Sequence, residues 1–310
     1  MSGARQKLLL LGGTGFIGTN LSSALVKDGH EVLVIGHTAD GVDLPDGVRP
    51  VPLALGAVDE LVALIVREQV DTVVHLVSTL KPSSMLDDYL VERDVVLTPA
   101  VRLASALADM GTRLVYFSSG GAIYGASCSE HVAEDDPCEP ISFYGQSKLE
   151  METHLRFLQR TRGLNALILR PSNPYGPHQA MNGAQGLVSV LLGRVAEKRS
   201  LEIWGDGSSV RDYIHVDDMV AMTCALIERG VEGTTLNIGS GEGHSLLDVV
   251  RIVEQVTGQG VPLDFRPARA ADVPRLVLDV ERLRDMGVYR SRPLSEGIRD
   301  YAAMFGLADK

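Results

Sequence analysis

The sequence predicts an α/β protein built on a doubly wound parallel sheet and followed by a smaller C-terminal lobe. Short apolar runs alternate with stretches of helical periodicity through about residue 170, which is typical of a parallel sheet covered by helices on both faces. A glycine-rich turn joins the first apolar run to the first helical stretch. Three prolines and a glycine in residues 171–177 then interrupt regular structure and mark the start of the second lobe.

Composition excludes several classes of protein. The chain has 310 residues, of which 45% are hydrophobic, and this is enough for one large or two interleaved α/β units. A formal net charge of -11 argues against nucleic acid or an anionic membrane surface as a partner. The three cysteines have no metal-ligand spacing, and no apolar run reaches the ~18 to 20 residues of a membrane helix. We therefore expect a cytoplasmic protein with reduced thiols, no metal and no membrane contact.

The first apolar run, Lys7–Leu11, leads into the sequence GGTGFIG and then into a helical stretch. Glycines at this spacing let the backbone turn tightly, approach a pyrophosphate and present a helix N-terminus to it. The strand, turn and helix context predicts a Rossmann-type dinucleotide site. Its predicted cofactor-binding residues are Gly12, Gly15, Phe16, Ile17 and Gly18.

The second strand, Glu31–Ile35, ends in Gly36, His37 and Thr38. A site for NAD usually has an acidic residue here, which accepts hydrogen bonds from the ribose hydroxyls. With no carboxylate to repel it, the 2'-phosphate of NADP fits over Gly36 beside His37 and Thr38. NAD held without that carboxylate is an equal alternative, so both cofactors stay open.

Two further strand ends face the same crevice. Residues 70–77 form a buried strand, so Leu76, Val77 and Ser78 are expected to line the cofactor, whereas His75 is expected to be packed and hydrogen-bonded rather than catalytic. The strand at 113–118 leads into SSGGAIYG, in which glycines allow close approach to a ring and serines supply hydroxyl donors.

A helix is expected to begin at Phe143, capped by Ser142. Tyr144 and Lys148 share one face of it because they are four residues apart. An ammonium beside a phenol favours the phenolate, and a tyrosine with a lowered pKa can take or give a proton at an alcohol or carbonyl.

Residues 1–172 are accordingly expected to form a dinucleotide-binding domain. Residues 173–310 are expected to form mainly a substrate-binding lobe, from which segments around 210–240 return to the first domain. The basic loop at 266–274 is either a solvated surface loop or a site that neutralises a diphosphate.

Five ordered motifs carry a resemblance to a known family: GGTGFIG at 12–18, SSGGAIYG at 118–125, YGQSK at 144–148, RPSNPYGP at 170–177 and IWGDGSSVRDYIHVDD at 203–218. With them, residues 7–305 resemble the extended short-chain dehydrogenase/reductase superfamily. Within it, the chain is similar to the sugar-nucleotide enzymes of the UDP-glucose 4-epimerase type, the NAD-dependent epimerase/dehydratase family.

The resemblance implies a mechanism. Tyr144 would remove the proton from the C4 hydroxyl of a sugar while hydride moves from C4 to the nicotinamide of NAD. Lys148 would lower the pKa of Tyr144 and bind the nicotinamide ribose. The 4-keto intermediate would then turn over and receive the hydride on its other face.

The resemblance also implies binding residues and an assembly. Pro171 and Ser172 match positions beside the nicotinamide. The positions that match the nucleotide-sugar site are Asn173, Arg211, Arg269 and Asp272 for the diphosphate and ribose, and Leu187 and Trp204 for the base. A homodimer through helices at about 95–110 and 148–162 is the implied oligomer.

One departure from the family concerns catalysis directly. Gly120 stands where the family usually has the Ser or Thr that hydrogen-bonds the C4 oxygen. That donor is therefore absent, or it is supplied by Ser119 or Ser118.

Three functions follow from these observations. The first is a sugar-nucleotide 4-epimerase, acting on a UDP-sugar with tightly held NAD. The second is an NDP-4-keto-sugar reductase that uses exchangeable NADPH, which Gly36, His37 and Thr38 favour. The third is a nucleotide-sensing protein without turnover, which Gly120 favours and which the intact Tyr144 and Lys148 oppose.

Overall fold

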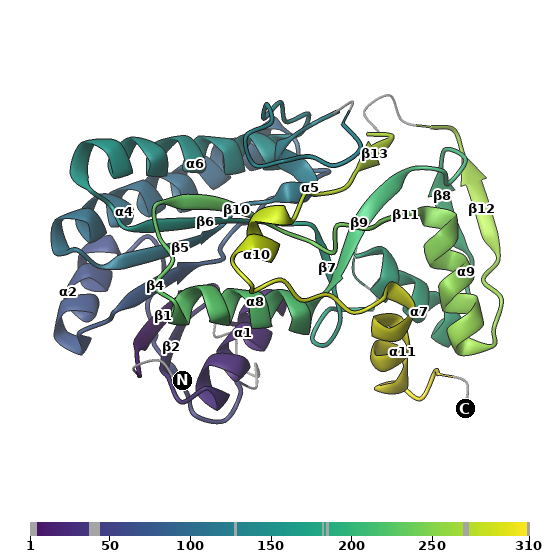
Figure 1. The fold of residues 1–310 in the computed structure, drawn as a ribbon, viewed down its shortest axis with the longest axis horizontal. Coiled ribbons are helices and arrows are strands. Elements are labelled where there is room, and N and C mark those ends of the chain that lie inside the picture. Colours follow the sequence, from purple (N-terminus) through teal and green to yellow (C-terminus); the bar gives the residue numbers. More distant parts are fainter. Residues whose placement is uncertain are drawn as a thin grey trace.

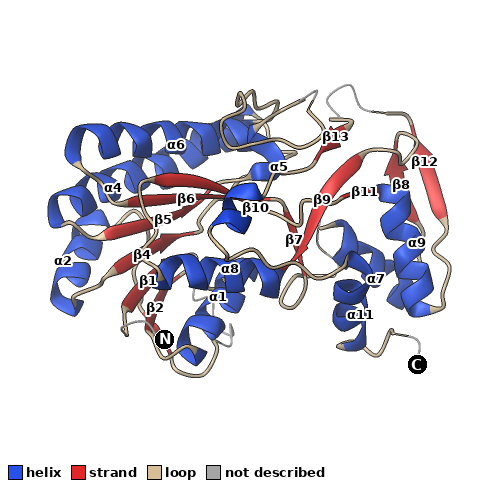
Figure 2. Ribbon diagram, viewed as in Figure 1, coloured by secondary structure: helices blue, strands red, loops and turns tan. Residues whose placement is uncertain are grey.

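The computed structural model describes residues 5–36, 44–126, 129–181, 183, 186–268 and 273–308. Figures 1 and 2 show a large sheet with helices on both faces and a smaller lobe beside it. The elements through the sixth strand are β1 (Lys7–Leu11), α1 (Phe16–Lys27), β2 (Glu31–Ile35), β3 (Val48–Pro50), α2 (Val58–Glu68), β4 (Thr72–His75), α3 (Leu86–Glu92), the π-helix η1 (Arg93–Leu97), α4 (Thr98–Met110), β5 (Arg113–Phe117), α5 (Gly120–Ile123), α6 (Phe143–Arg162) and β6 (Ala166–Pro171). The later elements are β7 (Asn173–Tyr175), α7 (Leu187–Glu197), β8 (Leu201–Trp204), β9 (Val210–His215), α8 (Val216–Glu228), β10 (Thr234–Ile238), β11 (Gly243–Ser245), α9 (Leu246–Thr257), β12 (Leu263–Arg266), β13 (Arg275–Leu276), α10 (Glu281–Asp285) and α11 (Leu294–Ala303).

The large sheet is parallel throughout, with the strand order β10-β6-β5-β4-β1-β2-β3. Helices α1 and α8 cover one face, and α2, α4 and α6 cover the other (Figure 1). The chain winds from β1 outward in both directions, so the predicted doubly wound α/β fold is confirmed.

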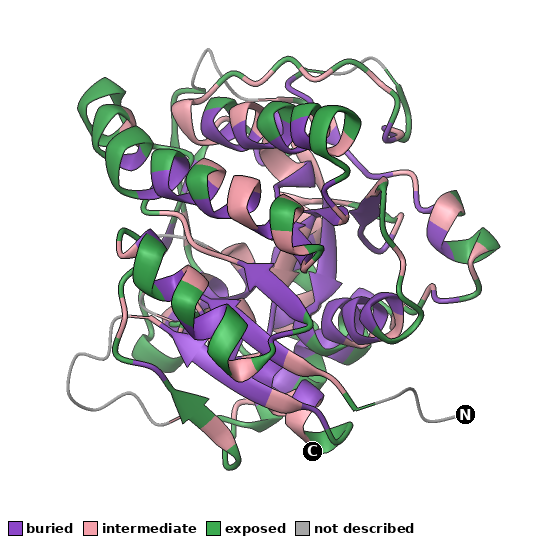
Figure 3. Cartoon of the chain, turned by 90° about the vertical axis from the view of Figure 1, so that its left-hand side faces the viewer, coloured by how far each residue is buried: buried purple, intermediate pink, exposed green. Residues whose placement is uncertain are grey.

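Both faces of this sheet are apolar because side chains alternate along each strand. Leu8 and Leu10 belong to the core beneath α1 and α8, whereas Leu9 and Leu11 belong to the core beneath α2, α4 and α6. Figure 3 shows the buried strands between helices whose outer sides are exposed. A sheet buried on both faces explains why β1 reads as a continuous apolar run.

The smaller lobe packs α7, α9 and α11 around a third apolar core, together with the short strands β8 and β12. Strand β9 pairs with β7, β11 and β13 in a second sheet, and the chain then returns to the large sheet. After it, α8 packs on α1 and β10 takes the edge of the large sheet beside β6. Residues 210–240 thus run from the smaller lobe into the large sheet.

Two local expectations were wrong. Residues 173–175 form strand β7, parallel to β9, although prolines surround it; a short edge strand tolerates proline because it needs few backbone donors. The helix expected from Val95 begins at Leu86 and contains the π-turn η1 before α4. Pro99 follows that wider turn directly and has no N–H to donate to it. Across the described ranges, no helix is both long and apolar enough to cross a membrane.

Candidate active site

The glycine turn has the geometry of a phosphate-binding turn. Gly12 adopts a φ of 82°, and its N–H donates to Ile35 O at 2.9 Å. A Cβ on Gly18 would lie 2.5 Å from Gly12 O, so only glycine lets α1 pack this closely on the turn. Gly15 precedes Phe16 and Ile17, whose N–H groups lie in the first turn of α1, where no intrahelical acceptor exists. These residues fit a pyrophosphate, as the sequence predicts.

The end of β2 is closed to a side chain. A Cβ on Gly36 would overlap the Thr14 side chain, with Oγ1 as the nearest atom and Cγ2 at 2.9 Å. The missing carboxylate therefore reflects the position of Thr14 at the glycine turn. His37 and Thr38, which were predicted beside it, lie outside the described residues.

Tyr144 and Lys148 lie on the first turns of α6, which Ser142 caps by accepting from Gly145 N at 3.1 Å. The Lys148 ammonium donates to Phe117 O at 3.0 Å and lies 5.7 Å from the centre of the Tyr144 ring. Ser119 lies close enough to the Tyr144 phenol to favour its ionised form. The structure thus brings the phenol, the ammonium and one hydroxyl together.

The ionisation of this pair differs from the sequence argument. Burial raises the pKa of Tyr144, while the neighbouring Ser119 opposes that change. The expected lowering of the Tyr144 pKa by Lys148 was wrong, because the ammonium is directed to Phe117 O rather than to the phenol. Burial also lowers the pKa of Lys148 to about 8, against the charges of Glu92 and Glu152.

The absence of a side chain at Gly120 has a steric cause. A Cβ there would lie 2.7 Å from Leu278 Cδ1 and 2.9 Å from Arg170 O. Both contacts are closer than atoms tolerate, so no serine fits at this position. Ser118 is buried, and its Oγ has no partner among the described residues. Of the two neighbouring serines, only Ser119 contacts Tyr144.

The end of β4 lies against the glycine turn. A Cβ on Gly12 would lie 3.1 Å from Val77 Cγ2, so the segment with Leu76, Val77 and Ser78 borders the predicted cofactor site. His75 is packed against Tyr116, with ring centroids 5.6 Å apart. The expectation that His75 is hydrogen-bonded was wrong, because neither ring nitrogen has a partner in the described structure. Its pKa is lowered to about 3 by burial and by Lys148, so the imidazole is neutral.

Two predicted cofactor residues, Pro171 and Ser172, lie next to the first predicted substrate residue, Asn173. Pro171 ends β6, and Ser172 N donates to Ile238 O at 2.8 Å, so both lie at the same edge as the strand ends above. Asn173 Nδ2 donates to Asp212 O at 2.8 Å. A Cβ on Gly121 would lie 3.5 Å from Asn173 Oδ1, which puts this amide beside α5.

The remaining predicted residues are farther along the smaller lobe. Arg211 lies on β9, two residues before the partner of Asn173 in the strand pair, and its Nη1 donates to Val210 O at 2.9 Å. Leu187 begins α7, and Trp204 ends β8 with 44% of its surface exposed. Arg269 and Asp272 lie outside the described residues.

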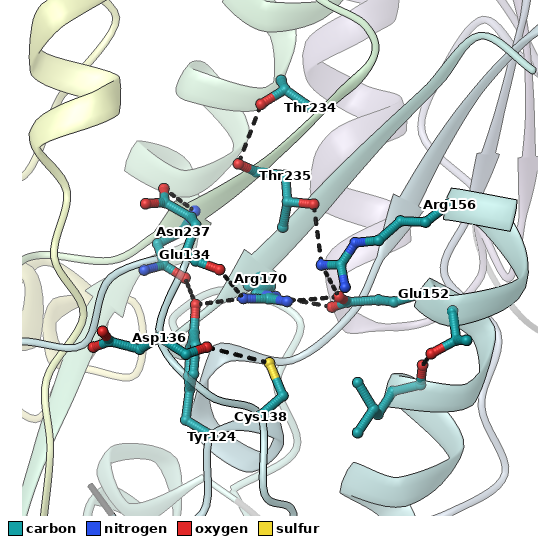
Figure 4. A network of polar contacts seen from close by, with 12 residues as sticks. Tyr124, Glu134, Asp136, Cys138, Glu152, Arg156, Arg170, Thr234, Thr235 and Asn237 are labelled. Atoms are coloured by element: carbon teal, nitrogen blue, oxygen red, sulfur yellow. Dashed lines mark hydrogen bonds and ion pairs between the residues drawn. The ribbon is translucent and has the colours of Figure 1, made fainter. Parts of the chain in front are cut away.

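Sequence reasoning missed a buried ionic network behind the site (Figure 4). Arg170 and Glu152 are fully buried and form a two-pronged ion pair, Nε to Oε1 at 2.9 Å and Nη2 to Oε2 at 2.7 Å. Arg170 also donates to the Tyr124 hydroxyl at 2.8 Å. Glu152 follows Lys148 by one helical turn, so the pair attaches α6 to β6 next to the site. The one sequence signal was the spacing of Glu152 from Lys148.

A glycine turn at the first strand and a Tyr-x-x-x-Lys pair with a buried lysine at the carboxyl edge of the same sheet define a dinucleotide-binding enzyme. The model of the "NAD dependent epimerase/dehydratase family" matches residues 8–239, and the chain belongs to that family.

Relatives and solved structures agree with this membership. The UDP-glucose 4-epimerase of Mycolicibacterium smegmatis is 30% identical over 313 residues, covering 97% of this chain and 98% of its own. The dTDP-4-dehydro-6-deoxyglucose reductase of Escherichia coli is 28% identical, covering 96% of this chain and 97% of its own. The structure of the Thermus thermophilus UDP-glucose 4-epimerase in complex with NAD has a TM-score of 0.88 at 30% identity, covering 97% of this chain and 99% of its own.

Proposed function

We propose that the protein is a UDP-sugar 4-epimerase that works with bound NAD. The observation that carries this proposal is the Tyr144 phenol, which lies beside Ser119 and close to the Lys148 ammonium at the carboxyl edge of the sheet. The relatives named UDP-glucose 4-epimerase support the choice of a UDP-sugar.

The residues present fit a dinucleotide, since no described side chain outside its two chain neighbours lies within 4 Å of the place a Cβ on Gly15 would take, just before the first N–H groups of α1. When bound, NAD supplies a hydride acceptor. Tyr144 Oη takes the proton of the C4 hydroxyl and returns it to the C4 oxygen of the epimer. The Ser119 hydroxyl donates to the same oxygen, in place of the Ser or Thr that the family usually has at position 120. The positive charge of Lys148 stabilises the phenolate when the ammonium turns from Phe117 O.

The other half of the substrate is assigned to the smaller lobe. Four residues are assigned to the diphosphate and the nucleoside ribose: Asn173, Arg211, Arg269 and Asp272. Leu187 and Trp204 contact the base. Trp204 has the exposed aromatic surface that stacking on a base requires.

A second candidate is an NDP-4-keto-sugar reductase that uses NADPH. Gly36 favours it, because Thr14 excludes the carboxylate that would repel a 2'-phosphate. The Escherichia coli reductase among the relatives favours it as well. Both candidates assign the proton transfer to Tyr144.

We also propose a homodimer. Apolar side chains are exposed along α3, η1 and α6, on the side of the large sheet away from α1 and α8. They are Leu86, Leu90, Val91, Val95 and Phe157, with exposed fractions between 38% and 56%. A second copy of the chain would cover them by two-fold pairing. The cytoplasm remains the proposed compartment, and light scattering of the purified protein tests the dimer.

The test of function has two parts. The purified protein is denatured and the released dinucleotide identified, and the native protein is incubated with UDP-glucose, UDP-N-acetylglucosamine and their C4 epimers without added cofactor. Released NAD with interconversion of either pair is the expected result. Released NADP or an empty site, without interconversion, would instead favour the reductase, which is then assayed by NADPH oxidation with NDP-4-keto-sugars.

A further inference from the structure

A narrow pocket with mixed polar and apolar lining lies next to Lys148, between α3, η1, α4, α6 and the ends of β4 and β5. Its polar lining comes from His75, Glu92, Tyr116, Ser147 and Lys148, and its volume is about 10 Å³. That space is close to the minimum that one water molecule needs. The charges around the pocket therefore interact with little solvent between them.

Glu92 is the acidic residue of this pocket and is only 2% exposed. Its Oε1 accepts from Ser78 Oγ at 2.9 Å. Its Oε2 accepts from Thr79 N at 2.7 Å and from Thr79 Oγ1 at 2.5 Å. Three donors from one loop suit a carboxylate, which only accepts hydrogen bonds. The loop that follows β4 thus holds the Glu92 carboxylate at the pocket.

Glu92 differs from the other buried acidic residue near Lys148, Glu152, in its ion pairs. Glu152 is already paired with Arg170 and with Arg156, at 2.7 Å from each. Glu92 forms no ion pair within 4.0 Å in the part of the chain that the structure describes. Its negative charge is therefore available to Lys148.

The other groups that face Lys148 are neutral. Burial and Lys148 lower the pKa of His75 on β4 to about 3, and burial raises the pKa of Tyr116 on β5 well above its usual value. Tyr144 on α6 is protonated at neutral pH because burial raises its pKa as well. Glu92 is consequently the unpaired anion of the site and the first of the two that favour the charged form of Lys148.

We propose that Glu92 is a positioning residue for the catalytic pair: its carboxylate, held by Ser78 and Thr79, keeps the Lys148 ammonium charged across the pocket that both side chains line. This inference rests on the proposed role of Tyr144 and Lys148. The anchoring loop also borders the predicted cofactor site, so the same carboxylate connects that loop with the base.

The charge of Glu92 changes the pKa values of Tyr144 and Lys148 in a definite direction. A negative charge near Tyr144 disfavours the phenolate, and near Lys148 it favours the ammonium. Removing the charge in Glu92→Gln moves the ionisation of both groups to lower pH. The amide has nearly the size of the carboxyl group, so the pocket stays filled.

Ionisation of Lys148 can be followed without any substrate. The Lys148 ammonium is titrated by the NMR chemical shift of its ε-carbon, which is assigned by its absence from the Lys148→Met variant. Glu92→Gln is expected to move the Lys148 midpoint to lower pH. Glu150→Gln is the matched control: Glu150 lies on α6 and accepts from the Tyr89 hydroxyl at 2.7 Å, yet it does not line the pocket. An unchanged midpoint in Glu92→Gln, or an equal change in the control, overturns the proposal.

Two measurements keep the test decisive. If Glu92→Gln does not fold, Glu92→Asp retracts the carboxylate by one methylene and is expected to move the midpoint in the same direction; an unchanged midpoint then overturns the proposal. Turnover is measured separately with the UDP-sugars. Absent turnover in the wild type counts against the epimerase, whereas the Lys148 titration still decides the role of Glu92.

Discussion

Glu152→Gln tests the ion pair that attaches the catalytic helix to the sheet. Glu152 and Arg170 are both 0% exposed, and two hydrogen bonds of 2.9 and 2.7 Å join them (Figure 4). The amide keeps the size and one acceptor oxygen but removes the charge. Arg170 then remains a buried cation, with the Tyr124 hydroxyl and Glu134 O as its remaining acceptors.

The expected loss of stability follows from leaving the Arg170 charge without its anion. Removing one partner of a buried pair costs about 3–5 kcal/mol, because the other charge stays desolvated. One retained acceptor and the two neutral contacts of Arg170 place the expected loss near the lower end, about 3 kcal/mol in the free energy of unfolding. Burial raises the pKa of Tyr124 and so keeps its hydroxyl neutral, which prevents it from replacing the lost anion.

The assay is urea denaturation followed by circular dichroism, with the midpoint and slope compared between variants. The control is Arg156→Gln, which removes the other cation on the same carboxylate. Arg156 lies 2.7 Å from Glu152 but has a side chain that is 36% exposed, so its loss should cost about 1 kcal/mol or less. A loss below about 1 kcal/mol in Glu152→Gln, or equal losses in both variants, would refute the reasoning.

Four further outcomes are expected. Tyr144→Phe abolishes turnover and leaves dinucleotide affinity unchanged, because it removes only the proton-transferring oxygen; near-normal turnover would exclude Tyr144 as the base. Ser119→Ala lowers kcat about 10- to 1000-fold, as for the loss of one hydrogen bond to the reacting oxygen, and an unchanged kcat would leave that oxygen without an assigned donor. Gly120→Ala destabilises the fold by about 1–3 kcal/mol through overpacking against Leu278, and unchanged thermal unfolding contradicts the steric argument. Activity declines as pH rises through about 8, where Lys148 loses its proton; a flat profile from pH 7 to 10 contradicts a charged Lys148.

The same titration of Lys148 affects stability with the opposite sign. The pKa of Lys148 is about 8 in the folded protein, whereas the ordinary pKa of a lysine is 10.5. The unfolded chain therefore binds more protons between these two values, and the contribution of Lys148 to stability rises with pH in that window. Comparing the pH dependence of urea midpoints in the wild type and Lys148→Met isolates this contribution.

Local sequence patterns predicted much of the fold. The bounds of β1 and β2 match the apolar runs Lys7–Leu11 and Glu31–Ile35, because a strand buried on both faces needs consecutive apolar residues. Ser142 caps α6 as expected, since a cap depends on the backbone two or three residues away. The glycine turn was also readable, because its spacing reflects contacts within one strand, turn and helix.

Local patterns predicted where Tyr144 and Lys148 lie but not how they ionise. Helical spacing placed both residues on one face of α6, but their ionisation depends on burial and on groups from other elements. Ser119 reaches Tyr144 from the end of β5, and Glu92 faces Lys148 from α3. A pattern along one helix contains no information about such neighbours.

The sequence by itself determined the order of the elements, the glycine turn and the placing of Tyr144 and Lys148 on one face of a helix, since each arises from residues close together in the chain. Only the tertiary structure decided that Leu278 excludes a side chain at Gly120, that Arg170 and Glu152 are buried as an ion pair, and that Glu92 lies next to the pair. Each of these features joins segments that fold together from distant parts of the chain. Their energies come from packing and desolvation, which depend on the complete three-dimensional surroundings of a residue.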